Sequence, residues 1–326
     1  MGATSGTGRA TRRGTVLVTD CDMGPAELER AVLEPAGYRV VEAGCRSEDD
    51  VVAAVTASGA EGLLVQYAPI SERVLRACPQ VRALLRYGVG MDTVDTEAAA
   101  ALGVVARNVP GYGTAEVADH AVGLLLSLLR GLPTWSAATA AGGWPSRGQL
   151  PDPRELRAST LGLLGFGAIA REVGARARAF GMRLVAHDPF VPGADVAAGG
   201  AEPVGFEELW RTSTAVSLHA PLTAGTRGVV GAAALSSMAP GSFLVNTARA
   251  GLVDRAALEA ALASGRLAGV GLDVWWQEPP APDDPLVRDP RVLLTPHVAW
   301  FSPGSLRRLR TSAASRLLEV LTAPPG

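Results

Sequence analysis

Two glycines and a later aspartate have the residue types and the spacing of a unit that binds phosphate and ribose. Gly165 permits a tight turn, and Gly167 leaves no Cβ between the backbone and an approaching pyrophosphate. Asp188 follows about twenty residues after the glycines, where a carboxylate accepts hydrogen bonds from an adenosine ribose and repels a 2′-phosphate. The pattern therefore predicts NAD(H) binding and disfavours NADP(H).

The elements around these residues are those that such a unit needs. Residues 161–164 form an apolar run typical of a buried strand, and residues 182–186 form a second one just before Asp188. Gly181 ends the intervening helix, whose apolar side chains recur at Ile169, Val173, Ala177 and Phe180. The N-terminus of that helix offers free N–H groups and a positive dipole end to phosphates. A βαβ crossover without a ligand has the same elements, but here the glycines and the aspartate are in register.

Composition limits the classes of function. The 326 residues are 48% hydrophobic and 19% charged, which suits large cores and two domains. A net charge of −2 gives no electrostatic reason to expect nucleic acid or an anionic membrane as a partner. All 30 basic residues are arginine, so Schiff-base and lysine-base chemistry are excluded.

The cysteines and the N-terminus favour a cytoplasmic protein. Cys21, Cys45 and Cys78 are odd in number and widely spaced, so we expect reduced thiols, with neither disulfides nor a metal site. Residues 1–14 carry arginines but no apolar stretch, which predicts a disordered tail and not a signal peptide. The longest apolar helix, around residues 121–129, is too short to span a bilayer.

Strands and helices are expected to alternate, as in α/β proteins with parallel sheets. In the first part of the chain they are expected in turn at 15–19, 25–33, 38–41, 51–57, 62–65, 71–77 and 81–86. Residues 87–92 form a glycine-rich turn at the carboxyl end of a strand, where such sheets bind ligands. Thr114 is expected to cap a helix, and residues 131–158 to form an extended arm. Later strands are expected at 215–218, 242–246, 269–274 and 292–295, and a last helix at 305–321.

Ordered motifs along the chain carry a resemblance to a known family. They are RYGVGMD (86–92), NVP (108–110) with EVADH (116–120), GFGAIA (165–170), SLHAPLT (217–223), VNTAR (245–249) with GLVD (251–254), GLDV (271–274) with EP (278–279), and TPH (295–297). From Thr15 on, the sequence resembles the D-isomer-specific 2-hydroxyacid dehydrogenases. Residues 297–302, HVAWFS, are similar to the branch that includes the C-terminal binding proteins.

The resemblance implies a fold of two α/β domains with Rossmann-like or flavodoxin-like parallel sheets. Residues 1–108 and 300–326 would form the substrate domain, and residues 109–299 an NAD-binding Rossmann domain inserted into it. Hinges are expected near 109 and 299, with a cleft between the domains.

The resemblance also implies NAD(H)-dependent hydride transfer to or from C2 of a small 2-oxo or 2-hydroxy acid. Arg249 follows a buried strand and offers a planar fork that matches a carboxylate, although a surface arginine paired with Asp254 is the plain alternative. His297 would be the acid/base, and Glu278 would hydrogen-bond its other ring nitrogen and favour the imidazolium. Outside these motifs, a lone histidine or a glutamate in a proline-rich loop would mean little.

Further site residues are implied by the same resemblance. Backbone N–H groups of Tyr87, Gly88, Val89 and Gly90 would bind the substrate carboxylate opposite Arg249, and Trp300 would form an apolar wall or pack the hinge. Of the other histidines, His120 is expected to be structural and His187 to lie beside the adenine. The cofactor would be lined by Val89, Val117, Gly165, Gly167, Ala168, Ile169, Asp188, His219, Ala220, Pro221, Thr226, Thr247, Ala248, Arg249, Asp273, His297 and Ala299.

The phosphate loop departs from the family pattern. Ala168 stands where a basic residue is common, and Ala170 where Gly is common. Losing a basic side chain removes a charge-assisted contact to the pyrophosphate, worth about 1.5–3 kcal/mol if buried. Arg171 is the residue that could compensate from the next position.

Alternatives remain at this stage. One is an NAD(H)-sensing, corepressor-like binding protein. Another is a dehydrogenase of the formate type, against which the acidic Glu278 argues, or of the phosphonate type, for which Arg86 is the one obvious extra cation. The 2-oxo acid itself is open. The arm at 131–158, with Trp135 and Trp144, suggests a homodimer interface.

Overall fold

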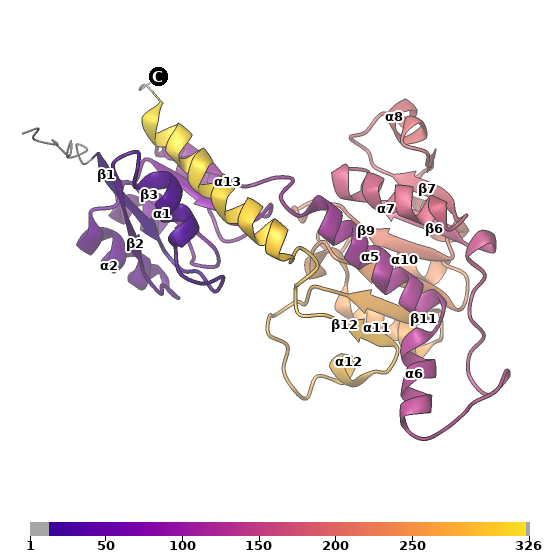
Figure 1. Cartoon of the computed structure of the whole chain (residues 1–326). Coiled ribbons are helices and arrows are strands. Elements are labelled where there is room, and N and C mark those ends of the chain that lie inside the picture. The colour runs from indigo at the N-terminus through magenta and orange to yellow at the C-terminus, as the bar shows by residue number, and fades with distance from the viewer. Residues whose placement is uncertain (1–12, 324–326) are drawn as a thin grey trace, which may run out of the picture. The chain divides into compact units, whose positions relative to one another are not determined.

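The computed structural model describes residues 13–323, which form two compact units (Figure 1). One unit contains the chain up to Tyr112 and from Ser302 onward, and the other runs from Gly113 to Phe301. Most of the N-terminal segment expected to be a disordered tail, residues 1–12, lies outside the described residues. We call these parts the first and the second unit; that the first binds the substrate stays a prediction.

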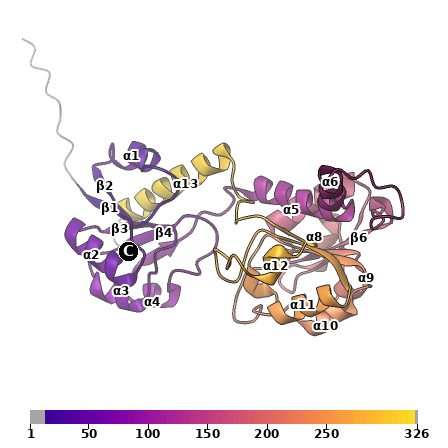
Figure 2. The same cartoon turned by 90° about the horizontal axis from the view of Figure 1, so that it is seen from below.

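The first unit is one parallel sheet with helices on both faces. Its strands are β1 (Gly14–Val18), β2 (Tyr38–Glu42), β3 (Gly62–Val65), β4 (Ala83–Arg86) and β5 (Val105–Arg107), in the order β2-β1-β3-β4-β5. Figure 2 shows α1 (Glu27–Leu33) and α13 (Pro303–Thr322) on one face, with α2 (Glu48–Ser58), α3 (Glu72–Ala77) and α4 (Thr96–Ala101) on the other. Because all the strands are parallel, their carboxyl ends meet at one edge of the sheet.

The second unit is a larger parallel sheet of the dinucleotide-binding type. Its strands are β6 (Thr160–Leu164), β7 (Arg183–His187), β8 (Glu202–Pro203), β9 (Ala215–Leu218), β10 (Ser242–Asn246), β11 (Leu267–Leu272) and β12 (Val292–Leu294). The order β12-β11-β10-β9-β6-β7-β8 reverses direction between β6 and β9, and such a switch point is where open α/β sheets bind ligands. The expected α/β fold with two parallel sheets is confirmed.

Helices cover both faces of the second sheet. In Figure 2, α5 (Thr114–Leu129) and α6 (Leu132–Ala140) lie on the side opposite to α9 (Phe206–Thr212), α10 (Ala232–Ser237) and α11 (Arg255–Ala263). The remaining helices are α7 (Ala168–Ala179), α8 (Gly193–Ala198) and α12 (Pro285–Arg288). Of these, α7 packs beside α5. Two glycines of β11 bring α5 close to the sheet, since an added Cβ would lie 3.0 Å from Leu128 at Gly269 and from Leu124 at Gly271.

Three local expectations differ from the structure. Residues 132–140 of the expected arm are the helix α6, which starts after Gly131 at a positive φ of 63° and has proline in its first turn. Gly113, not Thr114, is the N-cap of α5, and no side chain caps that end. The last helix begins two residues early because Ser302 forms a capping box with Ser305.

No single helix among residues 13–323 is long and apolar enough to cross a membrane, and only the bent pair α5 and α6 meets the length and composition criteria together. The same residues contain no cluster of three or more His, Cys, Asp or Glu side chains that could hold a metal ion. All three cysteines are free.

Candidate active site

The turn after β6 requires glycine at its first position. Gly165 has a φ of +87°, which L side chains rarely adopt. A Cβ there would lie 2.8 Å from the backbone of His219 and Ala220, in the loop after β9. The turn and this loop therefore touch at the switch point between β6 and β9, as a dinucleotide-binding crevice requires.

The space around the N-terminus of α7 is open, whereas the space around Gly165 is crowded. A Cβ at Gly167, the N-cap of α7, would meet nothing within 4 Å. No side chain caps this helix and its first turn holds no acidic residue, so its N–H groups and dipole can receive phosphates. Asp188 lies beside the turn, because its carboxylate accepts the Phe166 N–H at 2.8 Å. These features fit a dinucleotide.

Arg171, the residue that could compensate for the missing basic side chain of the loop, is engaged by other groups in this structure. Its guanidinium lies over the Phe166 ring, 4.7 Å from the centroid, and donates to the Asp195 carbonyl at 3.3 Å. These contacts direct the side chain toward α8. The phosphate loop thus relies on backbone N–H groups.

Two polar groups line the neighbouring strand ends. The Thr247 Oγ1 atom, just after β10, is buried and has no hydrogen-bond partner within the described part of the chain, as expected of an atom that awaits a polar ligand. His219 contacts the Ser217 hydroxyl through Nε2 at 2.9 Å, and burial lowers the pKa of His219 to about 4. The imidazole is therefore neutral at pH 7. Thr226 shapes the same loop by donating to the Pro221 carbonyl at 2.6 Å.

Asn246 positions Arg249, a role that the sequence analysis missed. The buried amide donates to the Arg249 carbonyl at 2.9 Å and accepts the Ala248 N–H at 3.0 Å. The turn after β10 is thus fixed by one side chain, and Arg249 emerges at the carboxyl end of the sheet. A polar residue that ends an otherwise apolar strand was the signal for it.

His297 and Glu278 form a hydrogen-bonded pair, as predicted. Nδ1 of His297 lies 2.8 Å from one Glu278 oxygen, and the Trp275 N–H donates to the other at 3.0 Å. Burial raises the pKa of Glu278, but the hydrogen bonds from His297 and Trp275, together with the charges of His297 and Arg249, outweigh it and lower this pKa. Glu278 is therefore ionised at pH 7 and keeps a proton of His297 on Nδ1. The other ring nitrogen, Nε2, does not take part in this hydrogen bond.

The backbone of His297 is unusual. Its φ of 55° makes it the one non-glycine residue with positive φ in the described chain, a conformation that persists only when its surroundings enforce it. The Trp300 indole donates to the His297 carbonyl at 3.0 Å. Asp273 accepts the N–H groups of Val298 and Ala299 at 2.9 and 2.8 Å. The expected place of Asp273 in the lining of the cofactor site stays a prediction.

A pocket of about 360 Å³ opens beside the pair. It is lined by Asp273, Val274, Trp275, Glu278, Pro279, Pro280, Leu294, Thr295, Pro296 and His297. Most of these side chains are apolar, while Asp273, Glu278 and His297 are the groups that can exchange a proton. This combination is typical of a site for a small polar ligand.

Tyr87 holds the start of the glycine-rich turn of the first unit in place through its backbone and its side chain. Its N–H donates to the Val65 carbonyl at 2.8 Å, so the expectation that this N–H binds a carboxylate is wrong. Its hydroxyl donates to Glu29 at 2.8 Å, and burial and the charge of Glu29 hold the pKa of Tyr87 well above its ordinary value. The N–H groups of Gly88, Val89 and Gly90 find no acceptor within the described residues and stay the predicted donors.

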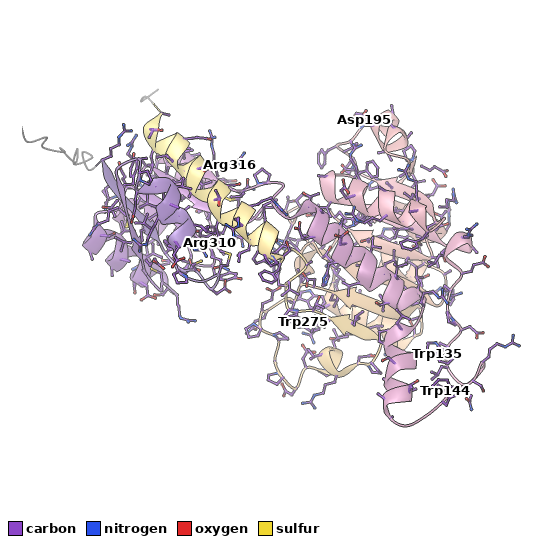
Figure 3. All side chains as sticks on the ribbon, viewed as in Figure 1. Trp135, Trp144, Asp195, Trp275, Arg310 and Arg316 are labelled. Atoms are coloured by element: carbon purple, nitrogen blue, oxygen red, sulfur yellow. The ribbon has the colours of Figure 1, made fainter. Side chains whose placement is uncertain are left out.

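Glu29 is itself neutralised by an arginine from the end of the chain. Arg310 of α13 donates to both Glu29 oxygens, at 2.8 and 2.7 Å, and also to the carbonyls of Met23 and Pro25. Both charged side chains are buried (Figure 3 labels Arg310). The sequence analysis missed this pair, since its partners are far apart and each is one charge on an amphipathic helix.

The structure brings most of the predicted residues into the second unit, at the carboxyl ends of β6, β9, β10 and β11. His187, at the end of β7, contacts the Val204 carbonyl through Nδ1 and packs edge-on against Phe206, and its place beside the adenine stays a prediction. The predicted substrate turn, residues 87–90, belongs to the first unit.

Comparison with known proteins places the chain among dehydrogenases. Residues 122–299, more than half of the chain, match the family described as D-isomer specific 2-hydroxyacid dehydrogenase, NAD binding domain. The (S)-sulfolactate dehydrogenase of Chromohalobacter salexigens is 38% identical over 77% of this chain and 82% of that protein. The D-3-phosphoglycerate dehydrogenase of Rattus norvegicus is 36% identical over 90% of this chain and 54% of that protein. The chain thus spans about half the length of the phosphoglycerate dehydrogenases that it matches.

A solved structure with a similar fold is the NADPH-dependent glyoxylate/hydroxypyruvate reductase of Sinorhizobium meliloti, in complex with NADP and malonate. It is 33% identical, with a TM-score of 0.82, over 95% of this chain and 94% of that chain.

Proposed function

Because the chain belongs to the D-isomer-specific 2-hydroxyacid dehydrogenase family and contains its NAD-binding domain, we propose that it interconverts a 2-oxo acid and a D-2-hydroxy acid with NAD(H). The observation that carries the proposal is the His297–Glu278 pair, 2.8 Å apart, with the charge of Arg249 close enough to lower the pKa of Glu278. A carboxylate-binding cation and a proton donor are the two groups that hydride transfer to a 2-oxo acid needs from the protein.

In this proposal the protein residues bind the substrate and move one proton. NADH supplies the hydride that reaches C2. Arg249 holds the substrate carboxylate with its planar fork, and Nε2 of the His297 imidazolium donates a proton to the C2 oxygen as that oxygen gains negative charge. Glu278 stabilises the imidazolium through Nδ1 before the transfer. The reverse oxidation uses the neutral imidazole as the base.

Preference for NAD(H) over NADP(H) follows from Asp188. Its carboxylate oxygens accept the N–H groups of Phe166 and Phe190 at 2.8 and 2.9 Å, which keeps the charge at the end of β7. A 2′-phosphate there would meet a negative charge. The Sinorhizobium relative is named as NADPH-dependent, so the preference has to be measured on this chain.

The substrate is a small 2-oxo acid whose side chain we leave open among glyoxylate, hydroxypyruvate, phosphate- or sulfonate-bearing acids and bulky aryl pyruvates. The relatives' names cover several of these classes. The N–H groups of Gly88, Val89 and Gly90 are proposed as further carboxylate donors, and Trp300 as an apolar wall. A cytoplasmic location stays a prediction.

The test is a spectrophotometric screen of these acids with NADH and with NADPH. Wild-type protein should oxidise NADH in the presence of at least one acid and prefer NADH over NADPH. Asp188→Asn, which keeps an acceptor for Phe166 but loses the charge, should shift this preference at least about tenfold toward NADPH. No turnover with any acid would refute the proposal, and a wild-type preference for NADPH would refute the role of Asp188.

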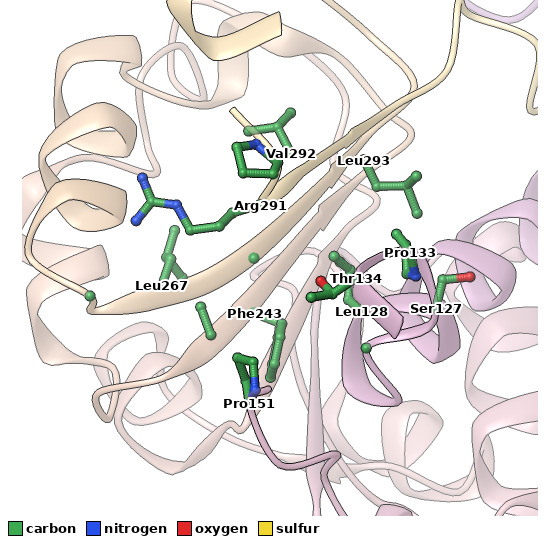
Figure 4. A pocket seen from close by; sticks show the side chains of 15 residues that line it. Ser127, Leu128, Pro133, Thr134, Pro151, Phe243, Leu267, Arg291, Val292 and Leu293 are labelled. Atoms are coloured by element: carbon green, nitrogen blue, oxygen red, sulfur yellow. The ribbon is translucent and has the colours of Figure 1, made fainter. Parts of the chain in front are cut away.

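We also propose that the protein is a homodimer through the arm around α6. This helix has apolar side chains but no buried residue, and Leu132 is 55% exposed. Trp144, after the helix, is 90% exposed. Figure 3 labels Trp135 and Trp144. The start of α6 lines a pocket of about 440 Å³ together with residues of α5, β10, β11 and β12 (Figure 4). Most of the lining is apolar, and Ser127, Thr134 and Arg291 are its polar members. An arm of a second copy is the occupant that fits such a surface, since monomers rarely expose apolar residues together.

A further inference from the structure

A chain of hydrogen bonds runs from α5 to the segment that carries His297. Nε2 of His120 lies 2.8 Å from the Thr295 hydroxyl, which donates to Asp273 Oδ1 at 2.6 Å. Asp273 is 1% exposed, and its Oδ1 atom also lies 3.7 Å from His120 Nε2. Thr295 lines the pocket beside Glu278, but the active site described above gives neither His120 nor Thr295 a chemical role.

The direction of these hydrogen bonds follows from counting protons. The Thr295 hydroxyl has a single proton, and a carboxylate can only accept, so that proton goes to Asp273. The Thr295 oxygen must then accept from His120, which therefore carries its proton on Nε2. Neutral and protonated forms of His120 both satisfy this arrangement, whereas a side chain without a donor at this position does not.

Asp273, at the far end of this series of hydrogen bonds, fixes the backbone on both sides of His297. Asp273 accepts the N–H groups of Val298 and Ala299, directly after the histidine. Thr295, two residues before it, accepts the His297 N–H through its carbonyl at 3.0 Å. Residues 295 and 298–299 are thus tied to one buried carboxylate, and between them His297 is held at a φ of 55°.

The fold brings His120 to this place through a close approach of helix and strand. Leu124 lies one turn after His120 on the same face of α5, and it packs on Gly271, where a Cβ would lie only 3.0 Å from the Leu124 Cβ. Asp273 follows Gly271 by two residues and therefore points to the same side of the chain. The glycine lets α5 come near enough for His120 to reach Thr295.

We infer that His120 and Thr295 are positioning residues for His297, acting through Asp273 on the backbone that aims the imidazole at the substrate. The inference rests on the proposed function, because it assumes that His297 transfers the proton. It assigns to α5 a part in the proton-transfer step, although no α5 side chain among those described forms a hydrogen bond with the imidazole of His297.

The kinetic test uses matched pairs. Thr295→Val keeps the shape of the side chain without the hydroxyl and should lower kcat about 10- to 100-fold, as expected for a misplaced catalytic group, while Thr295→Ser should restore most of it. His120→Ala should lower kcat, and His120→Gln, which presents a donor near Nε2, should lower it less. In Thr295→Val the solvent deuterium isotope effect on kcat should increase, since proton transfer becomes slower. Thr212→Val, which removes an exposed helix hydroxyl, is the control and should change nothing.

A crystal structure of Thr295→Val separates this inference from the proposed function, because it needs no turnover. We expect His297 to leave the left-handed region of φ or to lose its hydrogen bond with Glu278. The inference would be overturned if the His297 geometry is unchanged and kcat is unchanged in both Thr295→Val and His120→Ala. If Thr295→Val does not fold, an equal kcat in His120→Ala and His120→Gln would overturn it.

Discussion

At the scale of single residues, the chemistry depends on how Glu278 is held. Its carboxylate meets His297 on one oxygen and the Trp275 N–H on the other, so it cannot rotate away from the imidazole. The sequence predicted this pair because both residues stand in recognisable motifs. It did not predict Asn246, Thr295 or the Trp275 N–H, since hydrogen bonds between separate loops leave no spacing pattern along the chain.

Glu278→Gln should lower the rate of 2-oxo acid reduction. Glutamine still accepts a hydrogen bond from His297, but it lacks the negative charge that stabilises the imidazolium during proton transfer. Initial rates of reduction across a pH series measure this.

The lowered pKa of Glu278 predicts how the reduction rate changes at the acidic end of its pH profile. A carboxyl whose folded-state pKa is depressed keeps its charge below its ordinary titration range, and the interaction is lost only as pH falls through the depressed value. Loss of wild-type activity well above the usual titration range of a glutamate, together with an undiminished rate in Glu278→Gln, would contradict the role given to this residue.

At the scale of elements, the glycine turn and α7 show how much local sequence can say. Turn, helix and strand were predictable because glycine and apolar spacing act locally. The contact of Gly165 with the loop after β9 and the position of Arg171 on Phe166 were not, because both depend on elements that meet only in the folded sheet.

Gly167→Ala should weaken NADH binding at least about tenfold while leaving the protein as stable as a control variant. The added methyl enters open space at the N-cap of α7, which is where the proposed pyrophosphate lies. Gly205→Ala is the control, since Gly205 caps α9 and its Cβ would also meet nothing. Fluorescence titration with NADH and thermal melts compare the two. Equal NADH affinity in both variants would place the pyrophosphate elsewhere.

Arg310→Met should destabilise the first unit by about 3–5 kcal/mol, because it leaves the buried Glu29 carboxylate without its cation. Arg316→Met, six residues further along α13, loses a hydrogen bond to the Asn108 carbonyl but leaves no buried charge without a partner, and should cost much less (Figure 3). Denaturant unfolding of both variants measures the difference. Similar decreases in the free energy of unfolding of the two variants would mean that the pair of Arg310 and Glu29 stabilises the protein no more than an ordinary surface contact.

At the scale of the whole molecule, the fold was the most predictable feature. Alternating strand and helix patterns indicated parallel sheets along most of the chain, and both sheets are parallel. The arm was predicted poorly, since α6 buries none of its residues and a helix without a buried face has no strong pattern. We propose that its packing partner is a second copy of the chain.

The arm leads to a prediction about assembly. Leu132→Asp places a charge on the exposed apolar surface of α6 and should convert a wild-type dimer into a monomer. Leu102→Asp, a charge at an exposed leucine of the first unit, should leave the dimer intact. Sedimentation velocity of the three proteins decides the matter. A monomeric wild type would end the dimer proposal.

The most direct test of the whole account is the turnover of His297→Ala with NADH and the best 2-oxo acid. We expect kcat to fall about 10²- to 10⁴-fold, the usual contribution of a positioned general acid, while NADH binding changes little. Undiminished turnover in this variant would contradict the account, since the proton would then come from another group.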